Sequence, residues 1–396
     1  MRKFFTSLPF RLVLALAAGI IIGLVANAAV MQVIVTVQSL LGNLIMFCIP
    51  LIIIGFIAPS ITRLGSNASR LLGLALIMAY ISSIGAAFFS SFSGYVIIPH
   101  LNIVTDISHN RELPEQIFQL AIPQIMPVMS ALVIAILVGL ASIWNKAETF
   151  IKLLDEFQKM VISIVSAVII PLLPFFIGCT FASLSYEGSI TTQLPVFLVV
   201  IVIVIIGHYI WMALLYGIAG AYSGKNPFEV LRHYGPAYLT AIGTMSSAAT
   251  LSVALQCANK SSVLRKDMVA FGVPLFANVH LCGSVLTECF FVMTVSQVLY
   301  GQLPAVSTMI LFCLLLGIFA IAAPGVPGGT VMASLGLIIS VLGFDTAGTA
   351  LMLTIFALQD SFGTACNVTG DGALSLILTG YCEKRNIPEQ KMEISL

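Results

Sequence analysis

Long apolar runs dominate the chain and predict membrane-spanning helices. A helix needs about 20 apolar residues to cross the hydrocarbon core of a bilayer. Such stretches lie at 9–29, 36–58, 70–99, 119–144, 159–185, 193–218, 268–299 and 347–381. We therefore expect an all-α polytopic membrane protein with eight transmembrane helices.

Two further apolar segments, 229–258 and 303–343, are broken at their centres by small and polar residues. The first centre runs from Gly243 to Thr250 and the second from Ala323 to Thr330. Proline removes a backbone donor and glycine frees the backbone, so each centre is expected to turn. Irregular backbone is tolerated at membrane depth only where protein or a wet cavity surrounds it. The segments are thus either two re-entrant helical hairpins or two further spans.

The basic residues favour the hairpins. With a cytoplasmic N-terminus and two hairpins, Arg111 is the one Lys or Arg residue that falls outside. Ten full spans would also move Lys260, Arg265 and Lys266 outside, against the positive-inside rule. We therefore expect a protein of the plasma (inner) membrane with both termini in the cytoplasm. Hairpins that enter from opposite faces indicate inverted repeats, which are typical of secondary transporters.

The composition excludes several other classes of protein. Hydrophobic residues make up 59% of the 396-residue chain and charged residues 8%, whereas about a quarter of a soluble domain is charged. A net charge of +1 gives no reason to expect a nucleic-acid partner. The eight cysteines form no ligand-spaced pair, so neither a zinc site nor a disulfide framework is indicated. The sequence also contains no nucleophile–base or metal motif of an enzyme, and we expect no cofactor beyond a coupling ion.

Three acidic residues lie deep in apolar segments: Glu288, Asp360 and Asp371. A charge inside a membrane is unfavourable by roughly 2.5–3.5 kcal/mol and usually marks a functional site. Asp360, Thr364, Asn367 and Asp371 share one helical face, because they are spaced four, three and four residues apart. Their oxygen atoms suit a small alkali cation, and a free carboxylate suits an ammonium group. A polar seam between helices would explain the hydroxyl and the amide, but not two unpaired carboxylates.

The segment 268–299 is also interrupted. Pro274 and Gly283 can open its helix and free carbonyl groups to coordinate an ion. His280 lies between them, although a lone histidine is more often a satisfied core residue than a ligand. Glu288 is a candidate proton carrier, since a neutral carboxyl is the cheaper form in apolar surroundings. A carboxyl that is merely hydrogen-bonded within the bundle is an equal alternative.

Three motifs carry a resemblance to a known family. Gly243 to Val253 is similar to a serine-rich first-hairpin tip, and Gly325-Val326-Pro327-Gly328 to a second-hairpin tip. Asn367-Val368-Thr369-Gly370-Asp371 matches a last-helix signature outright. Together they resemble the dicarboxylate/amino acid:cation symporter family, which includes glutamate, neutral amino-acid and serine/threonine transporters.

This resemblance implies an elevator mechanism in a homotrimer. Residues 1–69 would supply scaffold helices 1 and 2, and residues 100–186 scaffold helices 4 and 5. Helix 3 (70–99) and residues 187–396 would form the moving transport domain. That domain would contain helices 6 to 8, hairpin 1 at 229–258 and hairpin 2 at 303–343.

The resemblance also assigns candidate binding residues. Asp360 would bind a substrate amino group, Asn367 would hold the substrate carboxylate, and Thr364 would lie beside the ligand. The other substrate-site candidates are Ser246, Ser247, Val326, Gly328, Thr330 and Gly363. Asp371 is the candidate sodium ligand. Asn367 is a candidate for the cation site as well as for the substrate site. The other cation-site candidates are Tyr80, Ser83, Phe276, Asn278, His280 and Cys282.

Two departures from the family pattern change the expected chemistry. Gly363 stands where the acidic-substrate branch has an arginine, so a neutral substrate is favoured, with room for a larger one. Cys282 stands where an ion-binding aspartate is usual, and a thiol is a poor ligand for a hard cation. At least one sodium site of the family is therefore expected to be weak or absent, with Glu288 or His280 carrying a proton instead.

The function expected from the sequence is symport of a neutral amino acid or similar small zwitterion across a lipid bilayer. A cation gradient would drive it, with sodium as the family default. The alternatives are a symporter of dicarboxylates or other organic anions, and a gated channel or non-transporting receptor.

Overall fold

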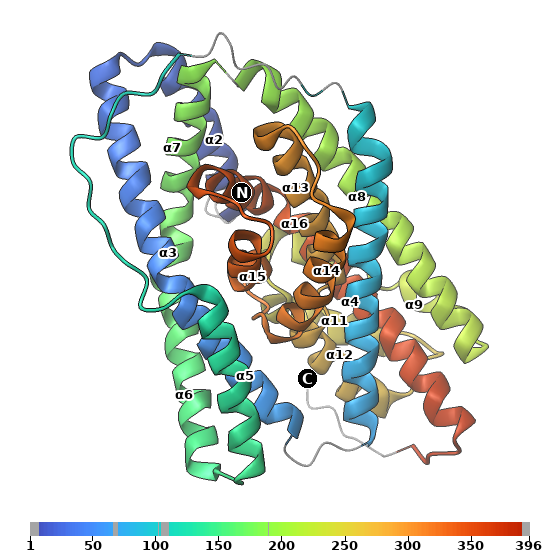
Figure 1. Ribbon diagram of the computed structural model, residues 1–396. Helices are drawn as coiled ribbons and strands as arrows, with labels where there is room; N and C mark the ends of the chain where they lie inside the picture. The colour runs from blue at the N-terminus through green and yellow to red at the C-terminus, as the bar shows by residue number, and fades with distance from the viewer. Residues whose placement is uncertain (1–7, 66–69, 102, 104–110, 189, 390–396) are drawn as a thin grey trace.

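The computed structural model describes residues 8–65, 70–101, 103, 111–188 and 190–389. Throughout these ranges the regular structure is helical and no strand occurs, which confirms the expected all-α class (Figure 1). The helices of the first half are α2 (Leu8–Val25), α3 (Ala28–Gly65), α4 (Arg70–Ile97), α5 (Val128–Trp144), α6 (Glu148–Ile164), α7 (Ile170–Glu187) and α8 (Ile190–Ser223). The short helix η1 (Ile98–His100) extends α4, and a π-helical turn, η2 (Val165–Ile169), joins α6 to α7.

Both broken apolar segments turn at their centres, as the glycine and proline residues predict. The first consists of α9 (Phe228–Leu231), α10 (Gly235–Thr244) and α11 (Ser247–Asn259). The second consists of α14 (Val306–Ala322) and α15 (Gly329–Ser340). Each turn contains a residue in the left-handed backbone conformation, Met245 with φ 53° in the first and Gly328 with φ 69° in the second. Ser246 then caps α11, because its Oγ accepts a hydrogen bond of 3.2 Å from Ala249 N.

The predicted interruption within 268–299 is confirmed as well. Helix α12 (Lys266–Val279) ends at an extended His280, and α13 (Cys282–Tyr300) begins two residues later. The last helix, α16 (Thr346–Lys384), is continuous through the polar stripe that contains Asp360 and Asp371.

The expectation of a helix over 119–144 is wrong in its first part. Residues 111–127 are not helical, and α5 begins only at Val128. Pro123 and Pro127 explain the difference, because each lacks a backbone donor and disfavours helix in the residue before it. This segment runs beside α3, where Asn43 Nδ2 donates to Leu120 O at 2.8 Å (Figure 1).

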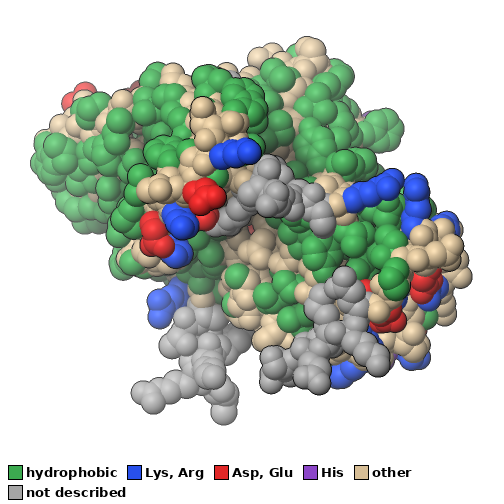
Figure 2. All heavy atoms as spheres, turned by 90° about the horizontal axis from the view of Figure 1, so that it is seen from below, with side chains coloured by type: hydrophobic (Ala, Val, Ile, Leu, Met, Phe, Trp, Pro, Cys, Tyr) green, Lys and Arg blue, Asp and Glu red, His purple; other side chains and the backbone are tan. Residues whose placement is uncertain are grey.

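Within the described residues, six helical stretches are long and apolar enough to cross a membrane. They include α2, much of α3, α4 with its extension, α6 to α7, most of α8, and α12 to α13. Helices α5 and α16 are not among them, so the count of eight spans stays a prediction. On the face seen from below, lysine and arginine side chains lie together with acidic ones, among broad apolar areas (Figure 2).

The helices pack in two groups. In the first, α2 lies against α7, and α3 contacts α5, α6 and α7. The α2–α7 contact is close, since a Cβ on Gly19 would lie 2.3 Å from Gly178 O. In the second group, α13 and α16 form a buried centre that α4, α8 and the two hairpins surround (Figure 1).

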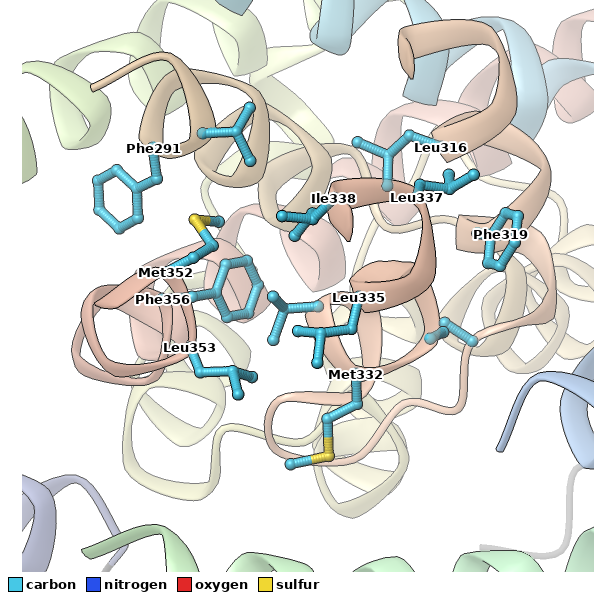
Figure 3. Packing of buried hydrophobic residues seen from close by; sticks show 14 of the residues in the cluster. Phe291, Leu316, Phe319, Met332, Leu335, Leu337, Ile338, Met352, Leu353 and Phe356 are labelled. Carbon is cyan, nitrogen blue, oxygen red and sulfur yellow. The ribbon is translucent and has the colours of Figure 1, made fainter. Parts of the chain in front are cut away.

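Apolar side chains hold the second hairpin to this centre. Leu335 and Ile338 of α15 pack toward Met352 and Phe356 of α16, with Phe291 of α13 beside them (Figure 3). All five side chains are fully buried. This packing fixes the position of the hairpin tip over the polar stripe of α16.

Candidate functional site

The tips of the two hairpins contact each other. Ser246 Oγ donates to Gly325 O at 2.6 Å, and Ala248 N donates to the same carbonyl at 3.3 Å. A Cβ on Gly325 would lie only 3.1 Å from Ala277 O of α12. The absence of a side chain at Gly325 thus lets three elements that are distant in sequence meet at one point.

Asp360 of α16 is bound to the tip of the second hairpin. Its Oδ2 accepts a hydrogen bond of 2.7 Å from the backbone amide of Gly328, and Thr364, one turn later on α16, is buried as well. The side chain of Asp360 is buried. The left-handed conformation of Gly328, which glycine adopts without a steric penalty, accompanies this approach.

Asn367 joins α16 to the first turn of α13. Its Oδ1 accepts from Gly283 N at 2.7 Å and from Ser284 N at 3.2 Å, and its Nδ2 donates to Ser284 Oγ at 2.9 Å. The amide thereby satisfies two of the backbone donors that a helix N-terminus leaves without an intrahelical partner.

The first turn of α13 packs against Gly363. A Cβ built on Gly363 would lie 3.3 Å from Ser284 Cα and 3.4 Å from Ser284 Oγ. The room for a larger substrate that the sequence predicted at this position stays a prediction.

Asp371, the predicted sodium ligand, contacts an imidazole. His280 Nδ1 lies 2.9 Å from Asp371 Oδ1, and His280 Nε2 lies 2.9 Å from Ser82 Oγ of α4. All three side chains are buried. The sequence did not single out Ser82. Its neighbour Ser83 was predicted, but Ser83 Oγ has no hydrogen-bond partner among the described residues.

The other predicted cation residues do not form a single cluster. The Tyr80 hydroxyl donates to Leu314 O of α14 at 3.2 Å. The Phe276 carbonyl accepts from His280 N at 2.9 Å. Asn278 is exposed and its Nδ2 donates to Pro274 O at 2.8 Å, whereas Cys282 is completely buried.

Glu288 connects α13 to the second hairpin. Ser334 Oγ of α15 donates a short hydrogen bond to Glu288 Oε1. The side chain is completely buried, and Oε2 has no partner in the described part of the chain. Sequence reasoning missed Ser334, which shares the mainly apolar segment after the hairpin tip with two other hydroxyl residues, Thr330 and Ser340.

A cavity of about 670 Å³ lies next to the hairpin tips. Ala248, Gly325 and Val326 line it from the two hairpins, and Gln158 and Ile162 from α6. The exposed Asn278 also faces it. The remaining predicted substrate residues, Ser247 and Thr330, are buried at the start of α11 and α15.

The described residues do not form an evident metal site. They contain no group of three or more His, Cys, Asp and Glu side chains placed to hold a metal ion. Asp371 Oδ1 faces an imidazole nitrogen, and Asn367 Oδ1 accepts from two backbone amides. Asp371 Oδ2 and Ser83 Oγ are buried oxygen atoms without a hydrogen-bond partner among the described residues.

Comparison with known proteins gives one family match over nearly the whole chain. The model of the sodium:dicarboxylate symporter family matches residues 8–381. Neutral amino acid transporter A of Bos taurus is 25% identical over 281 residues, which are 68% of this chain and 51% of that protein. Excitatory amino acid transporter 2 of Homo sapiens is 26% identical over 228 residues, 56% of this chain and 39% of that protein. The chain thus spans about half the length of these relatives or less.

Proposed function

Because the chain belongs to the sodium:dicarboxylate symporter family, we propose that it is a secondary active transporter of a neutral amino acid or similar small zwitterion. A cation gradient drives the uptake. The single observation that carries this proposal is the convergence of both hairpin tips on α16, through the Ser246–Gly325 and Gly328–Asp360 hydrogen bonds. The similarity to neutral amino acid transporter A and excitatory amino acid transporter 2 supports an amino acid as the substrate class.

Asp360 is the proposed partner of the substrate ammonium group. Its carboxylate is buried and accepts from a hairpin amide, so the departure of that amide would leave a charge in need of a cationic partner. The substrate carboxylate would meet the second N–H of Asn367 Nδ2, since only one is used by Ser284 Oγ. Backbone amides of Ser247 and Val326 would complete the site. Gly363 supplies no counter-charge for an acidic side chain.

The proposed mechanism is an elevator. Helices α2, α3, α5, α6 and α7 would form the scaffold, and α4 with α8 to α16 the moving transport domain. The packing of the helices in two groups supports this division. The cavity of about 670 Å³ lies between the hairpin tips and Gln158 of α6, where a substrate released toward the cytoplasm would pass.

A homotrimer in the plasma membrane, with cytoplasmic termini, completes the proposal. The non-helical segment 111–127 exposes Ile117 and Phe118 by more than half of their side-chain surface. Lipid cannot form hydrogen bonds with the free backbone groups of a non-helical segment. We therefore propose that a neighbouring subunit packs against residues 111–127.

The proposed coupling uses fewer sodium ions than the family default, with Glu288 as proton carrier. The hydrogen bond from Ser334 supports this role, since a carboxyl that contacts the second hairpin could couple its charge to the closure of that hairpin.

Uptake into proteoliposomes under imposed sodium and proton gradients tests the proposal. We expect concentrative uptake of at least one neutral amino acid, with a proton component that Glu288→Gln removes. Full sodium dependence that Glu288→Gln leaves unchanged would refute the proton part. Conductance in the absence of any amino acid would instead favour a channel.

A further inference from the structure

We propose that the imidazole of His280 takes the place of a sodium ion beside Asp371, so that this chain binds no sodium at that position. His280 is thereby the residue that sets the cation specificity of the site. The inference rests on the proposed function, because it concerns the coupling ion of the same transporter.

The ring takes one of the acceptor positions of Asp371 Oδ1. A carboxylate that binds sodium must be ionised, and an ionised carboxylate only accepts hydrogen bonds. In that state of Asp371, His280 Nδ1 carries the hydrogen in the 2.9 Å contact. A nitrogen that carries a hydrogen has no lone pair for a metal. The other ring nitrogen is engaged by Ser82 Oγ at 2.9 Å, so the imidazole is held from two sides.

The ring is also confined by its surroundings. A Cβ on Gly370 would lie 2.9 Å from His280 Cε1, so α16 packs directly against the imidazole. Phe276 approaches the ring edge-on with a centroid distance of 6.4 Å. His280 is completely buried, and a rotation that freed Asp371 Oδ1 would have to displace these neighbours.

Two of the oxygen atoms that could otherwise complete a sodium site have other partners. Asn367 Oδ1 accepts from two amides of α13, and the Phe276 carbonyl accepts from His280 N. Among the described residues Asp371 Oδ2 and Ser83 Oγ have no partner, but two oxygen atoms do not supply the several ligands that a hard cation takes. Cys282, also completely buried, contributes a soft thiol.

Sodium-dependent thermal stability of the substrate-free protein tests this inference. A cation that binds only the folded state raises the unfolding temperature in a saturable way. Unfolding is measured in sodium chloride and in choline chloride at equal ionic strength, for the wild type, His280→Asn, Asp371→Asn and the double variant. We expect the sodium-dependent rise to be larger in His280→Asn than in the wild type, and the excess to disappear in the double variant.

Two results would overturn the inference. One is a sodium-dependent rise in the wild type that Asp371→Asn abolishes. The other is a rise in His280→Asn no larger than that of the wild type, since removal of the ring should open the site.

A measurement on the wild type keeps the test valid if these variants do not fold. The chain has five histidines, so the ring N–H signal of His280 can be assigned in a ¹⁵N-histidine-labelled sample by substituting each of the others. We expect this signal to be unchanged when sodium chloride replaces choline chloride. Its loss or a saturable shift would contradict the inference. The thermal-unfolding and NMR measurements are both made without substrate. A failure to find any transported amino acid would therefore refute the proposed function but would leave the results of these two measurements unchanged.

Discussion

Gly283→Ala tests whether α13 begins directly against α16. A Cβ at this position would lie 2.5 Å from both Cys366 Cβ and Gly363 O. Ordinary contacts between heavy atoms lie near 3.5–4.0 Å, so the two helices must separate by about 1 Å. Overpacking of this kind is unfavourable by about 1–3 kcal/mol. The 2.7 Å hydrogen bond from Gly283 N to Asn367 Oδ1 would lengthen, which adds about 1 kcal/mol.

The expected total destabilisation is about 2–4 kcal/mol, or roughly 2–5 °C in the midpoint of thermal unfolding. Gly217→Ala is the matched control, because a Cβ on Gly217 of α8 meets no atom within 4 Å. Alanine favours a helix over glycine by about 1 kcal/mol, so the control should unfold at the same or a slightly higher temperature. Equal midpoints for the two variants would refute the close contact between α13 and α16.

Three other substitutions test single contacts of the site. Asn367→Leu leaves two amides of α13 without an acceptor and should lower stability by about 2–4 kcal/mol. Thermal unfolding measures this loss, and Thr354→Val, the control on the same helix, should have a much smaller effect. Ser246→Ala removes the bond between the hairpin tips, and amide hydrogen exchange at residues 323–329 should accelerate; unchanged exchange would contradict the contact. Ser334→Ala should destabilise the protein by about 1–3 kcal/mol, because it leaves both oxygens of the buried Glu288 without a donor. Glu288→Gln should destabilise it less, because the amide oxygen of the glutamine still accepts the hydrogen bond from the serine.

The turns and the polar face of α16 could be predicted from local sequence. Glycine and proline in the middle of apolar segments are strong signals, and the helices end there because of backbone chemistry alone. The spacing of Asp360, Thr364, Asn367 and Asp371 similarly followed from helical periodicity. The same proline rule, applied to Pro123 and Pro127, would have predicted that residues before α5 are not helical.

The partners of the polar residues could not be predicted in this way. Ser82 and Ser83 are adjacent, and only the rotation of α4 against the α12–α13 break decides which of them reaches His280. The space at Gly363 likewise depends on how closely α13 approaches α16, which a single sequence does not encode locally. Contacts between residues that are far apart in the sequence thus required the three-dimensional structure.

Counterflow exchange in proteoliposomes tests the central claim, that Asp360 receives the ammonium group of a neutral amino acid beneath the hairpin tips. Liposomes are loaded with one unlabelled amino acid, and entry of the labelled compound is followed without any ion gradient. The account predicts saturable exchange of at least one neutral amino acid, lost in Asp360→Asn and retained in Asp345→Asn, which keeps the side-chain oxygen that caps α16. Exchange of dicarboxylates alone, or exchange that persists in Asp360→Asn, would contradict it.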